Sequence, residues 1–527
     1  MTNPGDTSTR TATVNDSDEE PTPEESARNA NRSTTPGSEG FKAFIGSGWA
    51  QRDEALPSAR AQAQYAAARR AAVSAAFPGV RLIVPAGDMK QRANDTDYPY
   101  RAHSAFAHLT GWGSDSEPGA VLVFEPEGGE GHVATVYFRE RAGRDSEEFY
   151  ANPAIGEFWI GARPSLAHVA ADLAIATGGI ADLDRVFDAV DTSTLVLREA
   201  DAAITERVDH ARIRFAAEQA LSTNASDAPF SIEVGHEHAP DGELARVLSE
   251  LRLVKDEFEI AEMRAAVDAT QRGFTEVLAE LPRITSEVRG ERVIEGVFAT
   301  RARLEGNDVG YGSIAAAGPH ATILHWTRND GPVVPGDLVL LDAGVELDSY
   351  FTADITRTFP VNGSFSPVQR QVYEAVLEAA DAAFRVVKPG AIFREVHAAA
   401  MEVIARKTAE WGFLPVSAEE SLQPDNQFHR RYMVHGTSHH LGLDVHDCAQ
   451  ARRDLYMDGV LEAGMVFTIE PGLYFQPDDL TVPAEFRGIG VRIEDDILVT
   501  ADGAENLSVG IPRTVAEVEA WVRGAAG

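Results

Sequence analysis

The stretch that decides the fold of this 527-residue chain is residues 338–360, LVLLDAGVELDSYFTADITRTFP. Two runs rich in β-branched and aromatic residues flank a polar break at Asp348 and Ser349, and this pattern predicts a β-hairpin. A turn centred near Asp348 places Asp342 opposite Asp354, with both side chains on one face. Two carboxylates in contact repel each other unless one takes up a proton or a cation lies between them. The stretch predicts either a metal site or two solvated aspartates on an exposed hairpin.

Two later segments add further metal-binding residue types. Residues 435–447, HGTSHHLGLDVHD, hold four histidines in a short span that is otherwise apolar and glycine-bearing. Residues 464–472, GMVFTIEPG, form an apolar strand that ends at Glu470, where a Pro-Gly turn exposes the strand end. Glu470 is therefore expected where the edge of a sheet meets a cleft.

Residues 490–499, GVRIEDDILV, predict a strand with one charged face. Alternation places Arg492, Glu494 and Asp496 on one side of this strand and apolar residues on the other. A charged inner face needs a partner, because unpaired charges are costly to bury. This requirement favours the metal site over the solvated aspartates.

These phrases carry five potential ligands in a fixed order. The order is Asp342, Asp354, His439, Glu470 and Glu494. It resembles the dinuclear metallopeptidases of the pita-bread fold, and among them most closely the Xaa-Pro aminopeptidases, also called aminopeptidase P. The similarity extends from about Ala43 to Val509. It implies an α/β fold, in which a mixed α/β domain at the N-terminus precedes a pita-bread catalytic domain.

The resemblance also implies how the metal centre works. Asp342 holds one divalent ion and His439 the other, while Asp354, Glu470 and Glu494 bridge or share them. Four carboxylates and one imidazole suit Mn²⁺, with Co²⁺, Zn²⁺ and Fe²⁺ as alternatives. A water between two such ions becomes hydroxide at neutral pH and attacks the peptide carbonyl. Glu470 is expected to carry the proton from this water to the leaving amine.

Other polar residues of these phrases match family positions with supporting roles. His325, expected at a strand end, and His446 are expected to stabilise the oxyanion. His435 resembles a residue that lines the proline pocket, whereas His440 is expected to pack in the core. Arg492 is expected to pair with ligand carboxylates, as metal sites usually require.

The composition divides the chain into four parts. Residues 1–40 are polar and acidic with hardly any large apolar residue, and predict a disordered tail. Residues 41–240 alternate helical and strand patterns, and residues 241–515 carry the ligand phrases. Asp241 is predicted to cap the first helix of this catalytic domain. Residues 516–527 are expected to form a C-terminal tail that includes a short helix.

The N-terminal domain also has its own sequence signals. Residues 64–77 predict an alanine-rich helix, and residues 80–85, 119–124 and 132–138 predict strands. Residues 94–101, NDTDYPYR, resemble the amino-terminal domain of aminopeptidase P. Prolidases are expected to match this domain less well or to lack it.

Charge and cysteine content limit the partners and the compartment. The formal net charge is -35, so nucleic acid and anionic membranes should repel the protein. The single cysteine, Cys448, excludes intramolecular disulfides and suits a reducing cytoplasm, and a packing role is expected for it. Residues 1–40 lack the regions of a secretory signal. Family resemblance favours a homodimer or homotetramer.

The sequence thus predicts a metal-dependent aminopeptidase that removes the first residue of peptides with proline in second position. A tertiary amide before proline lacks the N–H that ordinary peptidases engage, so a dedicated pocket is required. The alternatives are a prolidase, which cleaves Xaa-Pro dipeptides, and a non-enzymatic binding module of the same fold. Because all five ligand positions are filled, the binding module is disfavoured.

Overall fold

The computed structural model describes residues 35–94, 96–129, 131–222 and 239–525. Most of the predicted disordered tail lies outside the described residues. The chain divides into two compact units, one of residues 1–54 and 141–164 and the other of residues 55–140 and 165–527. Among the described residues, no helix combines the length and the apolar character needed to cross a membrane.

The described residues of the smaller unit, 35–54 and 141–164, contain three short helices. They are α2 Glu39–Ile45, α5 Glu147–Ala151 and α6 Glu157–Ile160. The ring of Trp49 packs edge-on against Phe149 with centroids 5.6 Å apart, and the guanidinium of Arg144 lies 4.4 Å from the centroid of the Trp49 ring. Arg52 forms an ion pair of 2.8 Å with Glu157. A small aromatic cluster and a part-buried ion pair hold this unit together.

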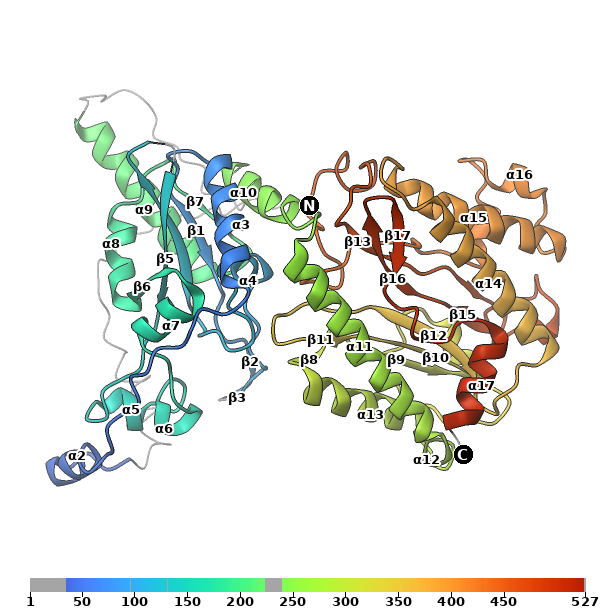
Figure 1. Cartoon of the computed structure of the whole chain (residues 1–527), viewed down its shortest axis with the longest axis horizontal. Coiled ribbons are helices and arrows are strands. Elements are labelled where there is room, and N and C mark those ends of the chain that lie inside the picture. Colours follow the sequence, from blue (N-terminus) through green and yellow to red (C-terminus); the bar gives the residue numbers. More distant parts are fainter. Residues whose placement is uncertain (1–34, 95, 130, 223–238, 526–527) are drawn as a thin grey trace, which may run out of the picture. The chain divides into compact units, whose positions relative to one another are not determined.

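The larger unit begins with a mixed five-stranded sheet in the order β6-β5-β4-β1-β7 (Figure 1). The strands are β1 Leu82–Pro85, β4 Val121–Glu127, β5 Gly131–Phe138, β6 Ala176–Gly179 and β7 Leu195–Val196, with a small hairpin of β2 Gln91–Ala93 and β3 Thr96–Asp97. The helices are α3 Ala63–Ala76, α4 Ser104–Thr110, α7 Leu166–Leu173, α8 Leu183–Asp188 and α9 Ala202–Ser222, with the 3-10 turn η1 Ile180–Asp182. The predicted helix and the three predicted strands of this region are confirmed, with slightly different ends.

Alternation along β1 explains why helices cover both faces of this sheet. Leu82 and Val84 join the apolar core shared with α3 and α4, whereas Ile83 joins the core shared with α8 and α9. Successive side chains of a strand point to opposite faces, so a continuous apolar run needs cover on both sides.

The rest of the larger unit contains two three-stranded sheets, β12-β10-β9 and β13-β16-β17, and the two-stranded pairs β11-β8 and β14-β15. The strands are β8 Asp308–Val309, β9 Ile314–Ala317, β10 Leu338–Ala343, β11 Val345–Glu346, β12 Ile355–Pro360, β13 Val466–Ile469, β14 Gly472–Tyr474, β15 Gly490–Arg492, β16 Asp495–Thr500 and β17 Gly503–Asn506. The helices are α10 Ala239–Glu250, α11 Glu257–Ala279, α12 Leu281–Ile284, α13 Gly290–Glu305, α14 Pro367–Val386, α15 Phe393–Glu410, α16 Ala418–Ser421 and α17 Val515–Ala525, with 3-10 turns η2 Gly318–Thr322, η3 Phe428–Arg431 and η4 Ala484–Phe486.

Four long helices pack in two pairs against these strands. Helix α11 packs along α13 and helix α14 along α15 (Figure 1). The apolar stripe of α11 is buried at Val267, Phe274 and Val277. Helix α14 begins with a capping box, in which Ser366 and Gln369 satisfy each other's backbone N–H groups. The predicted α/β fold is confirmed.

The central hairpin forms as predicted, but its predicted register is wrong. Strand β10 pairs with β12 so that Asp342 lies opposite Thr356, which puts the centre of the turn at residue 349. Asp354, the predicted partner of Asp342, therefore lies two positions before the observed partner, Thr356. The connection is longer than a tight turn because it contains β11, which pairs with β8. A shift of two residues preserves side-chain direction, so Asp342 and Asp354 still face the same side.

The hairpin contains one very close backbone approach. A Cβ atom added at Gly344 would lie 1.6 Å from the carbonyl oxygen of Ala353. No side chain fits there, so the glycine of the Asp-Ala-Gly sequence allows the backbones of the two arms to approach closely.

The predicted strand of residues 490–499 is interrupted. Strand β15 pairs with β14, whereas β16 pairs with β13, and Ile493 and Glu494 lie between them. The chain changes its pairing partner from β14 to β13 at this break, where the Glu494 N–H donates to the Thr356 carbonyl of β12 at 3.1 Å. This bond also joins the two three-stranded sheets.

The prediction that Asp241 caps a helix is wrong. Helix α10 begins at Ala239, so Asp241 lies inside its first turn. Its buried carboxylate accepts from the Val196 N–H at 3.0 Å and pairs with Arg198 at 2.9 Å and Arg212 at 2.6 Å. The aspartate anchors α10 to the end of β7, a role that local sequence does not reveal.

Replacing Asp241 by alanine should lower the free energy of unfolding by about 3–5 kcal/mol, because two arginines lose a buried partner. Denaturant unfolding followed by circular dichroism measures this change. Glu243→Ala is the matched control, since Glu243 lies in the same helix with its side chain 51% exposed. Equal losses in the two variants would contradict the anchoring role.

Candidate active site

A cavity of about 630 Å³ lies where the two three-stranded sheets meet. It is lined by all nine residues that the sequence singles out for catalysis or metal binding. They are His325, Asp342, Asp354, His435, His439, His446, Glu470, Arg492 and Glu494. The structure brings these residues together from segments as far apart as the turn after η2 and the break between β15 and β16.

Asp342 and Asp354 meet at one phenol. The hydroxyl oxygen of Tyr311 lies 2.7 Å from Asp342 Oδ1 and 2.5 Å from Asp354 Oδ1. A phenol has a single proton and donates to one carboxylate at a time. The arrangement therefore requires a further proton or a cation near the two aspartates.

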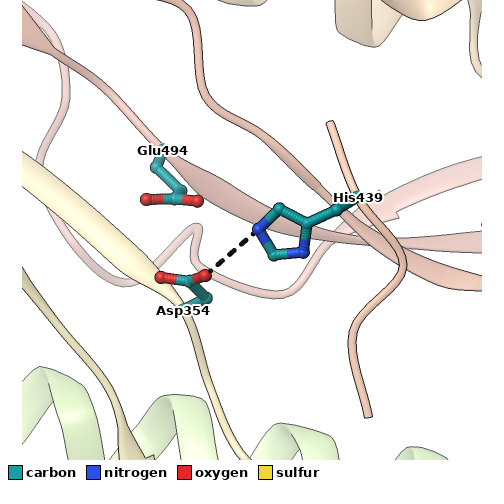
Figure 2. A group of neighbouring side chains, drawn as sticks. All are labelled: Asp354, His439 and Glu494. Atoms are coloured by element: carbon teal, nitrogen blue, oxygen red, sulfur yellow. Dashed lines mark ion pairs between the residues drawn. The ribbon is translucent and has the colours of Figure 1, made fainter. Parts of the chain in front are cut away.

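Three side chains form a tighter group beside these aspartates. Asp354, His439 and Glu494 each offer one ligand atom, and the three atoms lie within 4.8 Å of one another. His439 Nε2 lies 3.3 Å from Asp354 Oδ2 and 3.6 Å from Glu470 Oε1. Figure 2 shows the imidazole pointing toward Asp354, with the Glu494 carboxylate facing the same space.

Burial makes this concentration of negative charge unfavourable. Burial raises the pKa of Glu470 to about 7, although His439 and Arg492 act against it. Burial, together with Asp354 and Glu470, raises the pKa of Glu494 well above its usual range. Divalent cations would remove this conflict, and the oxygen-rich donor set fits them.

The one histidine among the candidate ligands also has a raised pKa, which for an imidazole favours the charged form. Burial alone would lower the pKa of His439, but the hydrogen bond to Asp354 and the charge of Glu470 raise it to about 9. The surrounding carboxylates thus favour positive charge at this point in the cavity.

A network of hydrogen bonds holds the carboxylates in place. Arg492 pairs with Asp342, as the sequence predicts, and its Nε donates to Thr356 Oγ1 at 3.0 Å. Thr356 in turn donates to Glu494 Oε2 at 2.7 Å. Arg492 Nη1 donates to the Tyr474 hydroxyl at 3.1 Å. One buried arginine therefore orients carboxylates from both sheets.

Two exposed histidines face the cavity from other segments. The ring of His446 lies edge-on to His439 with centroids 4.4 Å apart. Burial and the charge of His439 lower the pKa of His446, which favours the neutral imidazole. The prediction that His325 lies at a strand end is wrong. His325 lies in the turn after η2. Pro319 at the start of η2 favours a helical turn here over an extended strand.

His435 is neutral and has a defined tautomer. Its Nδ1 lies 2.5 Å from the Gly436 carbonyl oxygen, which can only accept, so the neutral ring carries its proton on Nδ1. Its Nε2 then accepts from the Tyr474 hydroxyl at 2.8 Å. Burial and the charge of Arg492 lower the pKa of His435 to about 3. Its Nδ1 lies 3.6 Å from Glu470 Oε2.

Two neighbouring residues pack rather than face the cavity. The buried ring of His440 stacks on Phe393 with centroids 4.7 Å apart, and neither of its nitrogens has a hydrogen-bond partner within the described segments. Cys448 is also buried, and burial and the nearby Asp447 raise the pKa of its thiol to about 12. Such a thiol is not a nucleophile at neutral pH.

Sequence reasoning missed three residues of the site. Thr356 shares the strand parity of Asp354, and Tyr474 that of Glu470, so alternation could have found both. Tyr311 has no local signal, because its partners follow it by 31 and 43 residues.

Two family profiles match the chain. "Metallopeptidase family M24" matches residues 261–501, which contain all nine candidate residues, and "Aminopeptidase P, N-terminal domain" matches residues 66–196. Xaa-Pro aminopeptidase 1 of Streptomyces coelicolor is 50% identical over 481 residues, which cover 91% of each chain. Xaa-Pro aminopeptidase of Escherichia coli is 32% identical and covers 86% of this chain and 96% of its own.

Solved structures of the same kind superpose on this chain. An aminopeptidase of Pseudomonas aeruginosa matches with a TM-score of 0.73 and 32% identity, covering 88% of this chain and 99% of its own. Zinc-substituted aminopeptidase P of Escherichia coli in complex with product matches with a TM-score of 0.73 and 30% identity, covering 89% and 99%.

Similarity at this level over nearly the full length of both chains makes the protein a metal-dependent aminopeptidase, a hydrolase that acts on peptides. The predicted pita-bread catalytic domain and the N-terminal domain before it are confirmed by these matches. The chain belongs to the aminopeptidase P family within metallopeptidase family M24.

Proposed function

We propose that this protein removes the first residue from peptides whose second residue is proline. The observation that carries the proposal is the convergence of five candidate ligands, three histidines and one arginine on a single cavity. Relatives named Xaa-Pro aminopeptidase, which match both the catalytic and the N-terminal regions, support the proline specificity. They do not favour a prolidase.

We propose that residues of both sheets hold two divalent ions and that Mn²⁺ is the preferred metal. The ligands are Asp342, Asp354, His439, Glu470 and Glu494. Hard, oxygen-rich donors suit Mn²⁺ better than thiolate-seeking ions. When bound, such ions polarise a carbonyl group and lower the pKa of water to near neutrality.

Glu470 has the position needed to move a proton. It follows β13 at the edge of the cavity, with its carboxylate 3.6 Å from both His439 and His435. The proline nitrogen leaves as an amine only after it gains a proton. Glu470 takes this proton from the attacking water and delivers it to the nitrogen.

The remaining polar residues bind and orient the peptide. His325 and His446 donate hydrogen bonds to the carbonyl oxygen, where negative charge develops in the transition state. His435 lines the pocket for the proline ring, and Val445 adds an apolar wall to the same cavity. Arg492 keeps Asp342 in its binding orientation through their ion pair.

Three further properties stay predictions. A net charge of -35 disfavours nucleic acid and anionic membranes as partners. The single cysteine fits a cytoplasmic location. A homodimer or homotetramer follows from the family resemblance.

Asp354→Asn should reduce kcat/KM by about 100-fold or more, because an amide cannot replace a charged ligand. Elemental analysis should show less bound metal, while circular dichroism shows the same fold. Asp502→Asn is the control, since Asp502 is exposed in the turn between β16 and β17. Undiminished turnover after exhaustive chelation, in protein free of metal, would show that the proposed metal centre is not needed.

Xaa-Pro-Xaa tripeptides should be cleaved at least about tenfold faster in kcat/KM than Xaa-Pro dipeptides, which is roughly 1.4 kcal/mol in transition-state binding. An aminopeptidase leaves room for the chain beyond proline, whereas a dipeptidase closes that end and captures the proline carboxylate. Steady-state kinetics on matched peptides measures the ratio. Cleavage of dipeptides without cleavage of longer peptides would identify a prolidase instead.

A further inference from the structure

The loop that carries His435 has no regular secondary structure of its own. Residues 432–438 follow η3 and belong to no strand, and Val434 is 59% exposed. The two ends of this loop are bonded to the β13–β14 segment, because the Tyr474 N–H donates to the Tyr432 carbonyl at 3.0 Å and the Glu470 N–H donates to the Thr437 carbonyl at 2.8 Å. Loops that hold functional side chains need support from a rigid scaffold. The position of His435 in the cavity therefore depends on what holds this loop.

A single guanidinium, that of Arg430, contacts three successive carbonyls of the loop. Its Nε donates to the Met433 carbonyl at 2.9 Å, and its Nη2 donates to the carbonyls of Val434 at 2.5 Å and His435 at 3.2 Å. A planar guanidinium presents its donors in a fixed fork, which a lysine cannot reproduce. The fork fixes the path of the backbone on both sides of Val434.

The same guanidinium also supports the far end of the loop. Arg430 Nη1 donates to His397 Nε2 at 3.3 Å, so the imidazole proton is on Nδ1 and is donated to Thr437 Oγ1 at 3.0 Å. The carbonyl of Thr437 accepts from the Glu470 N–H at 2.8 Å. Arg430 is thus connected through His397 to the backbone that positions Glu470.

The neighbouring arginine differs in all of these respects. Arg431 is 56% exposed in its side chain and pairs with Asp479 at 2.9 Å, away from the cavity. Within the described segments Arg430 forms no ion pair with a carboxylate, and its side-chain hydrogen bonds go to the loop and to His397. Two adjacent residues of one type therefore serve different purposes, and Arg431 provides a matched control.

We infer that Arg430 is a positioning residue for proline selectivity, because it fixes the loop that presents His435 to the second residue of the peptide. The inference rests on the proposed function, in which His435 lines the proline pocket. Without the guanidinium, three carbonyls lose their donor and the loop can relax. Misplacement of binding groups by about 1 Å can cost about 100-fold in rate.

The test compares the full chain with Arg430→Ala, Arg430→Lys and Arg431→Ala on Xaa-Pro-Xaa and Xaa-Ala-Xaa tripeptides. In Arg430→Ala, kcat/KM for the proline peptide should fall about 10- to 100-fold, with a smaller change for the alanine peptide. The ratio of the two values is the decisive readout, because general loss of folded protein lowers both peptides equally. Added guanidinium ion should restore part of the ratio in Arg430→Ala, and Arg431→Ala should keep the ratio of the wild type.

Thermal unfolding of each variant separates folding from selectivity. If Arg430→Ala does not fold, Arg430→Lys keeps the positive charge without the fork and should show the same direction of change. A folded Arg430 variant with the wild-type ratio overturns the inference and leaves the proposed function intact. A wild-type protein with no preference for proline overturns both.

Discussion

Repulsion among buried carboxylates is the constraint around which this molecule is built. Asp342 and Asp354 share one phenolic proton at Tyr311, and Glu494 and Glu470 lie within the same cavity. A buried carboxylate normally takes up a proton or finds a cation. The family to which the chain belongs uses divalent cations, so folding of the site and binding of metal are energetically linked.

The site draws its carboxylates from both three-stranded sheets. Asp342 and Asp354 come from the hairpin of β10 and β12, whereas Glu470 and Glu494 come from the ends of β13 and β15. Beneath Glu494, the fully buried Arg357 pairs with Asp495 at 2.7 Å and donates to the Glu494 carbonyl at 2.6 Å. A buried ion pair of this kind contributes little net stability, but it specifies the path of the backbone. Arg357 thus fixes the backbone that carries Glu494, while Arg492 holds the side chain of Asp342.

The carboxylates of the site could be predicted from the sequence because they lie on strands or directly beside strand ends, where alternation still determines side-chain direction. The register of the hairpin was wrong by two positions, yet Asp342 and Asp354 still face one side, because an even shift preserves parity. Errors arose where tertiary contacts override local signals. Asp241 looks like a helix cap but pairs with two distant arginines, and Tyr311 joins the site through contacts that no local pattern encodes.

The support of the loop that carries His435 is the part of the site that the sequence predicts least. The histidine of this loop, His435, could be found from its residue type, but the support of the loop by Arg430 could not, because a guanidinium that bonds to carbonyls leaves no complementary charge in the sequence. Backbone acceptors are present at every residue, so a motif cannot mark which of them a side chain chooses.

The burial of Cys448 makes the chain well suited to site-directed spectroscopy. Thiol-reactive dyes and spin labels attack the thiolate, and this sole cysteine is both inaccessible and held in its protonated form. A second cysteine placed on the surface would therefore be labelled selectively without first removing the native one. At Val434, which is exposed beside His435, such a label would report the motion of the loop while a peptide binds.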